Sequence, residues 1–173
     1  MASDGGIRGG GGSEMDEGLD AGQNPTDAGW SVRVRGGDRR EARVYSGRNE
    51  FTVAGQATFS DGGAHPSAVE YLLGALGGDL VCGFQRLAEK RGLSIEGLES
   101  VVSGRLDNPM VFLGVVGAEG GAGFGPVTAT LYVTSDEEEP ALREVWRATL
   151  ATSPLVNTLR RCVALSLDLR PTP

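Results

Sequence analysis

The most regular hydrophobic pattern of the chain lies at 66–87, PSAVEYLLGALGGDLVCGFQRL. Large apolar side chains recur there every three or four residues, which is typical of an α-helix. Pro66 suits the first turn of a helix, where its missing N–H is not needed, and Lys90, Arg91 and Gly92 resemble an ordinary C-terminal end. The polar side is short, so we expect a long central helix that is covered on most sides. Its apolar positions are Val69, Leu72, Leu73, Leu76, Leu80, Phe84 and Leu87.

Alternating apolar and polar residues precede and follow this helix, and such alternation predicts strands. Three short strands are expected before the helix, separated by turns that contain glycine. After it we expect three strands, a helix beginning near Pro140, a further short helix and a closing strand. Strands and helices that come in blocks predict an α+β fold with mainly antiparallel pairing. The predicted strands lie at 30–35, 40–45, 51–55, 94–106, 110–116, 127–134 and 163–170, and the short helix at 156–159.

The 173 residues suffice for one domain with a real core,, which we place at 29–173. Residues 1–28 are rich in glycine and acidic residues and poor in large apolar groups, so we expect a disordered tail,. That tail carries most of the net charge of −7, and the nearly neutral remainder argues against a nucleic-acid partner. No apolar run is long enough for a membrane span, and no secretory signal is visible, so we expect a cytoplasmic location.

A group of arginines on the first two strands and the turn after them is open to two interpretations. It is either the solvated face of the strands or an anion-facing patch. The group comprises Arg33, Arg35, Arg39, Arg40, Arg43 and Arg48.

Asp79 follows Gly77 and Gly78 in the middle of the apolar helix. A carboxylate there is costly unless it is paired or protonated. Asp79 therefore either bonds to a partner, which would be a neighbouring hydroxyl, a backbone group or a group across a dimer, or serves as an acid/base or ligand-anchoring group.

Three segments together resemble the OsmC/Ohr family of osmotically inducible and organic hydroperoxide resistance proteins. Residues 66–80, with Glu70, resemble the family's PxExLLAALGGC helix, and 88–99 (AEKRGLSIEGLE) resembles the exit from that helix. Residues 153–159 (SPLVNTL) resemble the family's CPVSNTL or SPVxxTL. The likeness covers roughly 29–170. It implies an OsmC-like fold and an intertwined homodimer whose active sites borrow residues from both subunits. A helix that is apolar on most faces also argues for a two-fold partner.

The resemblance further implies a thiol peroxidase cycle in which one cysteine attacks the hydroperoxide and a second resolves the sulfenic acid. Those two positions fall on Asp79 and Ser153 in this chain, whereas the family's glutamate is kept as Glu70. Both redox sulfur atoms are thus absent from their expected places. An arginine partner could come only from Arg39, Arg40, Arg43 or Arg48. A Glu70–Asp79 dyad would need two subunits or a bent helix.

The remaining candidates have simpler interpretations. Cys82, one turn after Asp79, and Cys162 are expected to be small buried hydrophobes, although a disulfide between them stays open. His65 is expected in an exposed loop. The glycine-rich GAEGGAG at 117–123 lacks a following GKS or GKT and is interpreted as a hairpin loop. We expect no cofactor and no metal.

The sequence supports three hypotheses. The first is a homodimeric OsmC-like protein that has lost the two-cysteine cycle and uses the pocket between its subunits, with Asp79 and Glu70 in it, to bind a small organic molecule or a partner. The second is a one-cysteine, thiol-dependent peroxidase in which Cys82 reduces hydroperoxides in an oxidative-stress response. The third is a scaffold whose acidic tail recruits a basic partner.

Overall fold

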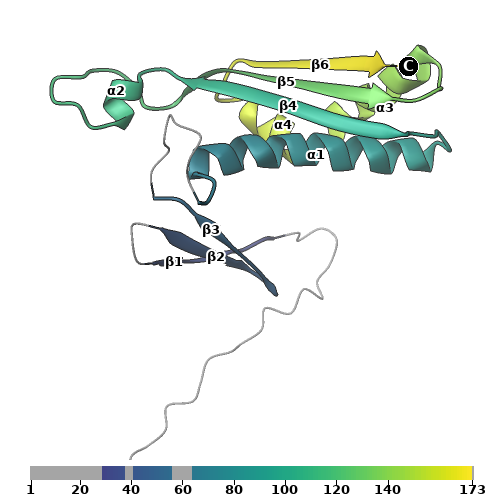
Figure 1. Ribbon diagram of the computed structural model, residues 1–173. Helices are drawn as coiled ribbons and strands as arrows, with labels where there is room; N and C mark the ends of the chain where they lie inside the picture. Colours follow the sequence, from purple (N-terminus) through teal and green to yellow (C-terminus); the bar gives the residue numbers. More distant parts are fainter. Residues whose placement is uncertain (1–28, 38–40, 56–63, 173) are drawn as a thin grey trace, which may run out of the picture. The chain divides into compact units, whose positions relative to one another are not determined.

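The computed structural model describes residues 29–37, 41–55 and 64–172 (Figure 1). The predicted disordered tail at 1–28 lies outside these residues, as do Arg39 and Arg40. Every described helix and strand belongs to one compact unit that begins at Arg33. Among the described residues, no helix is both long enough and apolar enough to cross a membrane.

The first sheet is the predicted meander of three short antiparallel strands, β1 (Arg33–Gly36), β2 (Ala42–Ser46) and β3 (Asn49–Val53). Its register sets Val34 beside Val44 and Val44 beside Phe51, so these apolar side chains share one face,. The arginines of β1 and β2 alternate with them onto the other face. Trp30, predicted to begin the first strand, precedes β1 and is 90% exposed.

The second sheet contains β4 (Gly97–Leu106), β5 (Phe124–Thr134) and β6 (Leu165–Thr172) in that order. β4 and β5 are antiparallel, whereas β5 and β6 are parallel. The parallel pair arises because α3 (Glu139–Thr152) and α4 (Pro154–Leu159) connect the two strands,. The predicted α+β class with mainly antiparallel pairing is confirmed.

The predicted strand at 110–116 is wrong. Pro109–Phe112 form the short helix α2, and turns follow it. Asn108 starts this helix because its side-chain oxygen accepts a hydrogen bond of 2.9 Å from the N–H of Met110,. Gly114 then has a φ of 70°, which an extended strand does not contain,. The apolar run at 110–116 therefore lies in the connection between β4 and β5 rather than in the sheet.

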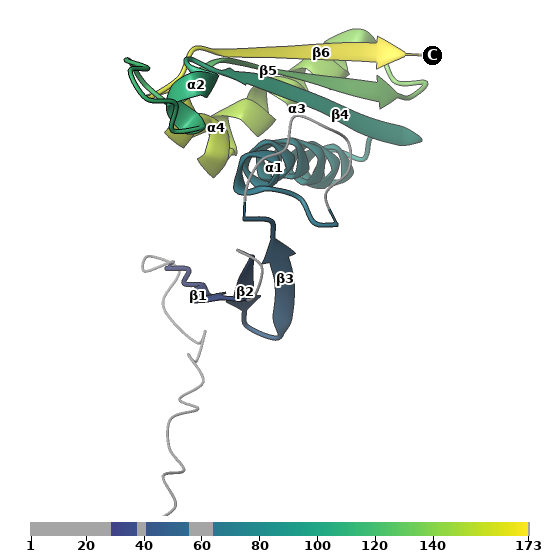
Figure 2. The ribbon, with the colours of Figure 1, turned by 60° about the vertical axis from the view of Figure 1, so that its left-hand side comes forward.

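The long helix α1 (Ala68–Lys90) lies on the same face of the second sheet as α3 and α4 (Figures 1 and 2). Its fully buried residues pack into one core with inward-facing residues of β5 and with α3. This packing fixes which side of α1 faces the sheet. The residues of α1 outside this core are therefore the ones that can contribute to a functional site. The core residues on α1, β5 and α3 are Leu76, Leu80, Phe84, Ala88, Val127, Ala129, Leu131, Val133, Leu142, Val145 and Trp146.

The start of α1 is joined to the end of β3. The hydroxyl of Tyr71 donates a hydrogen bond of 2.9 Å to the backbone carbonyl of Thr52. The rings of Tyr71 and Phe51 lie 4.9 Å apart between centroids, and the N–H of Ala54 donates to the carbonyl of Pro66. These contacts position the first turns of α1, which carry Glu70.

Candidate functional site

Asp79 and Ser153 contact each other although 74 residues separate them in the chain. The Ser153 hydroxyl donates a hydrogen bond to Oδ2 of Asp79 and accepts one of 2.9 Å from the N–H of Val156. Ser153 is buried, and Asp79 is half-buried. Of the interpretations that the sequence leaves open for Asp79, the structure shows the bond to a neighbouring hydroxyl.

The local sequence explains why Ser153 occupies this place. Ser153 ends α3 and is the N-terminal cap of α4, with Pro154 as the first residue of the new helix. A serine hydroxyl in this position satisfies one of the N–H groups that a helix start leaves free. The same hydroxyl donates a hydrogen bond to Asp79 on α1. The pair therefore ties α1 to the start of α4.

The hydrogen bonds of this pair limit what it can do chemically. The Ser153 hydroxyl uses its single proton on Asp79 and accepts from a backbone N–H, so it is not set up as a nucleophile. Neither side chain contains sulfur, and neither can form a sulfenic acid or a disulfide. The two positions that the resemblance assigns to the redox cysteines are adjacent in space, but an oxygen–oxygen hydrogen bond joins them.

Glu70 belongs to the first turn of α1, where it forms a capping box with Ser67. Its Oε2 accepts hydrogen bonds of 2.7 Å from both the N–H and the hydroxyl of Ser67, and the N–H of Glu70 donates to that hydroxyl at 3.3 Å,. The two hydrogen bonds from Ser67 lower the pKa of Glu70, and the bond from the hydroxyl has a larger effect than the bond from the N–H,. Glu70 therefore has a structural task in addition to any role in a site.

Glu70 and Asp79 do not form a dyad within the described chain. The nine residues between them correspond to about 13.5 Å along an ideal helix, and α1 runs without interruption from Ala68 to Lys90. Each carboxylate instead bonds to a serine, Glu70 to Ser67 and Asp79 to Ser153.

Replacing Glu70 by glutamine is expected to change how stability depends on pH. Because the folded-state pKa of Glu70 is lowered, its contribution is complete above the unfolded-state pKa of about 4.3 and is lost as pH falls through the folded-state value. Glutamine keeps the capping box but does not titrate. Thermal unfolding from pH 7 to pH 3 should show a wild-type advantage at neutral pH that disappears in acid.

The matched control for that experiment is Glu89→Gln, which removes the same charge from an exposed position near the other end of α1. A difference between wild type and Glu70→Gln that stayed constant from pH 7 to pH 3 would contradict the assignment of the hydrogen bonds to the carboxylate.

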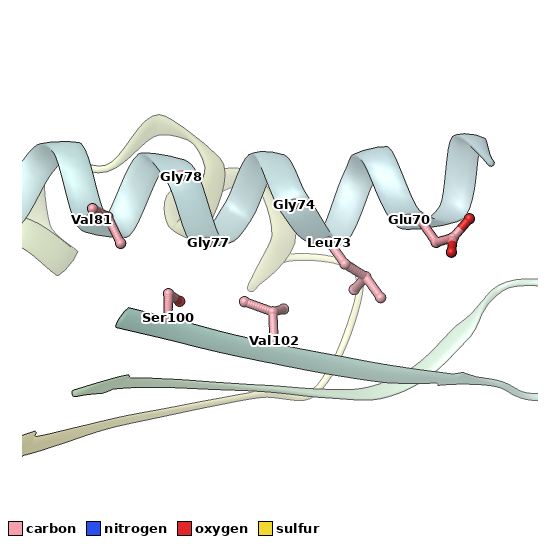
Figure 3. A pocket seen from close by; sticks show the side chains of 8 residues that line it. All are labelled: Glu70, Leu73, Gly74, Gly77, Gly78, Val81, Ser100 and Val102. Carbon is pink, nitrogen blue, oxygen red and sulfur yellow. The ribbon is translucent and has the colours of Figure 1, made fainter. Parts of the chain in front are cut away.

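A cavity of about 490 Å³ lies between α1 and β4 (Figure 3). Figure 3 shows Glu70 at one end of the lining residues of α1, with Ser100 and Val102 facing the helix from the strand. Glu70 is the one charged side chain in this lining, and Asp79 is not part of it. The predicted pocket with both carboxylates lies between two subunits, so this cavity within one chain does not test it, and it stays a prediction. Its lining consists of Glu70, Leu73, Gly74, Gly77, Gly78, Val81, Ser100 and Val102.

The glycines of α1 shape the side of the cavity that the helix forms. A Cβ atom added at Gly77 would meet Ser100 Oγ at 3.3 Å and Val102 Cγ2 at 3.2 Å, whereas one added at Gly74 or Gly78 would meet nothing within 4 Å. Gly77 thus permits the close approach of β4, and the other two leave the space open. Because glycine destabilises a helix interior, several glycines in one helix indicate that another element packs closely against it. The sequence does not show which strand that element is.

Both cysteines differ from their predicted burial. Cys82 and Cys162 are free thiols with exposed side chains, and they form no disulfide with each other. Cys82 is exposed because it lies two residues, or about 200° of helix rotation, beyond the fully buried Leu80. It does not line the cavity between α1 and β4.

The other candidate residues lie outside the cavity. Arg43 and Arg48, two of the four possible pocket arginines, are exposed and do not line it. Arg33 and Arg35 are also exposed, which agrees with their interpretation as a solvated strand face. The Cζ atom of Arg33 lies 5.1 Å from the centroid of the Tyr45 ring.

His65 is exposed as predicted. The glycine-rich loop at 117–123 precedes β5 in the long connection between the antiparallel strands β4 and β5, but it follows α2 and not the strand that the sequence predicts before it. Across the described part of the chain, no group of three histidine, cysteine or acidic side chains is arranged to hold a metal ion.

Comparison with known proteins finds similarity in sequence and in fold. The family model described as "OsmC-like protein" matches residues 60–168. An OsmC-like protein from Mycoplasma pneumoniae has 15% identity and a TM-score of 0.70, with 85% of this chain and 99% of that chain covered. Comparison with curated protein sequences finds no match.

Two structures named for hydroperoxide resistance are also similar. For the organic hydroperoxide resistance protein OsmC of Legionella pneumophila, the identity is 12% and the TM-score 0.60, with 83% of this chain and 97% of that chain covered. For OhrB of Bacillus subtilis, the identity is 19% and the TM-score 0.55, with 83% and 98% covered. At these identities the structural likeness concerns the fold, and it confirms the predicted one.

Proposed function

The chain belongs to the OsmC-like protein family, and from this premise we propose that it is a homodimeric member without the two-cysteine peroxidase cycle, which binds a small organic molecule in the cavity between α1 and β4. The observation that carries the proposal is the hydrogen bond between Asp79 and Ser153. The cycle requires a thiolate to attack the O–O bond and a second thiol to resolve the product. Neither step has a sulfur atom at these two positions.

The cavity supports a binding role. It is lined mainly by aliphatic side chains and glycine, with one carboxylate and one hydroxyl, and its volume of about 490 Å³ lies in the range of small-molecule sites,. Two structural relatives are named for organic hydroperoxide resistance, which favours an organic ligand with an apolar body.

Exposed apolar groups support the homodimer. Leu72 on α1 is 38% exposed, and on the first sheet Val34 and Phe51 are 56% and 39% exposed. A second copy would remove these apolar surfaces from water, and two-fold dimers are the commonest soluble oligomers. Light scattering on the purified full chain tests this part of the proposal: a mass of twice 18.0 kDa is expected, and a monomer would contradict it.

A second candidate function is a one-cysteine peroxidase that uses Cys82, and the exposure of this thiol favours it. The thiol would attack the hydroperoxide, release an alcohol and become a sulfenic acid, which an external thiol would reduce. Trapping with dimedone during hydroperoxide treatment distinguishes the two functions. The leading proposal predicts no rapid labelling of Cys82, whereas rapid labelling that Cys82→Ser abolishes would favour the peroxidase.

Binding of 1-octanol tests the proposed cavity. We expect the alcohol to shift the NMR amide signals of Gly74, Gly77 and Gly78. Gly74→Leu should weaken the shifts of Gly77 and Gly78, because Gly74 lines the cavity and a Cβ added there meets no atom within 4 Å, so the leucine side chain can extend into the cavity. The control Ala151→Leu adds the same side chain to an exposed position of α3. Equal binding by wild type and Gly74→Leu would show that the alcohol binds elsewhere.

A further inference from the structure

Resting on the proposed binding function of the cavity between α1 and β4, we propose that its ligand class is an aliphatic amine, with the hydrocarbon chain along α1 and the ammonium group at Glu70. The cavity contains a carboxylate at one end and an uncharged wall along the rest of its length (Figure 3). One end of the cavity is therefore suited to a cationic head group, and the rest of its length is suited to a hydrocarbon chain.

The carboxylate end has capacity left for a ligand. Both Ser67 hydrogen bonds reach the same oxygen, Oε2 of Glu70, and a carboxylate can accept more hydrogen bonds than these two. The serine bonds also hold the side chain in one orientation and favour its ionised form,. No lysine, arginine or histidine is among the described residues that line the cavity. An ammonium group is complementary to the ionised carboxylate of Glu70, the charged side chain of the described lining,.

The wall accommodates a chain. Leu73, Val81 and Val102 contribute aliphatic surface, and Glu70 and Val81 lie about 16 Å apart along an ideal helix. The Ser100 hydroxyl is buried near Gly77 and has no hydrogen-bond partner within the described residues, so it is one polar group in an otherwise aliphatic wall. Burial of CH₂ groups along this wall would supply most of the affinity.

The charge of Glu70 sets the preference between ligands of equal chain length. A fatty carboxylate would place a like charge beside Glu70 and meet no compensating cation in the described lining. A neutral alcohol would bury the same chain without an ionic contact. Because Glu70 is exposed, solvent weakens the ion pair, and we expect a preference of about three- to tenfold for the amine over the alcohol.

The test titrates octylammonium, 1-octanol and octanoate into the full-length protein below their micelle concentrations, with the NMR amide signals of Gly74, Gly77 and Gly78 as the readout. Octylammonium should bind most tightly and octanoate most weakly. Glu70→Gln keeps the capping box and should reduce octylammonium affinity to that of 1-octanol, whereas Glu89→Gln, the same change elsewhere on α1, should leave the order unchanged.

The outcomes separate this inference from the function on which it rests. If 1-octanol binds but octylammonium binds no more tightly than octanoate, the ligand class is wrong and the binding cavity stands. If Glu70→Gln leaves the preference for octylammonium intact, the assignment to Glu70 is overturned. If none of the three compounds binds, the proposed binding function fails and the ligand class fails with it.

Discussion

Replacing both Asp79 and Ser153 by cysteine is expected to produce a disulfide under mild oxidation. The two side chains already contact each other, and because cysteine is one atom shorter than aspartate, the S–S bond requires α1 and α4 to move closer together. A bond between positions 74 residues apart restricts the unfolded chain and should raise the free energy of unfolding by up to about 4 kcal/mol.

The measurement compares urea unfolding of the oxidised and the reduced double variant in a Cys82→Ser background, which removes the nearby native thiol. The reduced double variant is the matched control, because it differs from the oxidised protein only in the S–S bond. Failure to form the bond in the folded protein, with ready formation after partial unfolding, would show that the two positions do not meet as described.

Replacing Leu80 by alanine is expected to destabilise the protein by about 2–5 kcal/mol, the range for large-to-small changes in a core. Leu80 is fully buried and follows Asp79 directly, so the packing that it anchors also fixes the direction of the Asp79 carboxylate. The same substitution at Leu72, which is 38% exposed on the same helix, should cost less than about 1 kcal/mol.

Unfolding of both leucine variants should be compared with that of wild type at several protein concentrations, because the stability of a homodimer depends on concentration in wild type and variants alike. Equal losses at the two positions, independent of concentration, would contradict the orientation of α1 on the second sheet.

The periodic segments of the sequence predict most of the fold. The spacing of Leu76, Leu80 and Phe84 identifies the buried side of α1, and the alternation in 127–134 identifies β5. The error at 110–116 has a local cause: an apolar run does not reveal that the Asn108 cap and Gly114 turn it away from the sheet. The parallel pairing of β6 depends on the path through α3 and α4, which hydrophobic periodicity does not encode.

The site was less predictable than the fold. Asp79 and Ser153 are recognisable through the family resemblance, yet their contact depends on the angle at which α4 leaves α3. Ser100 and Val102 look like ordinary strand residues, and only the fold sets them opposite Gly77. The exposure of Cys82 follows from its rotation relative to Leu80, so that error was avoidable from helix geometry alone.

Hydroperoxide consumption by the purified wild-type protein, with dithiothreitol as reductant, tests most directly whether a chain with Asp79 and Ser153 at these positions has lost the thiol cycle. We predict a rate equal to that of the reaction without protein, and the same rate for Cys82→Ser. Rapid turnover by wild type that Cys82→Ser abolishes would contradict the account and assign the chemistry to the exposed thiol.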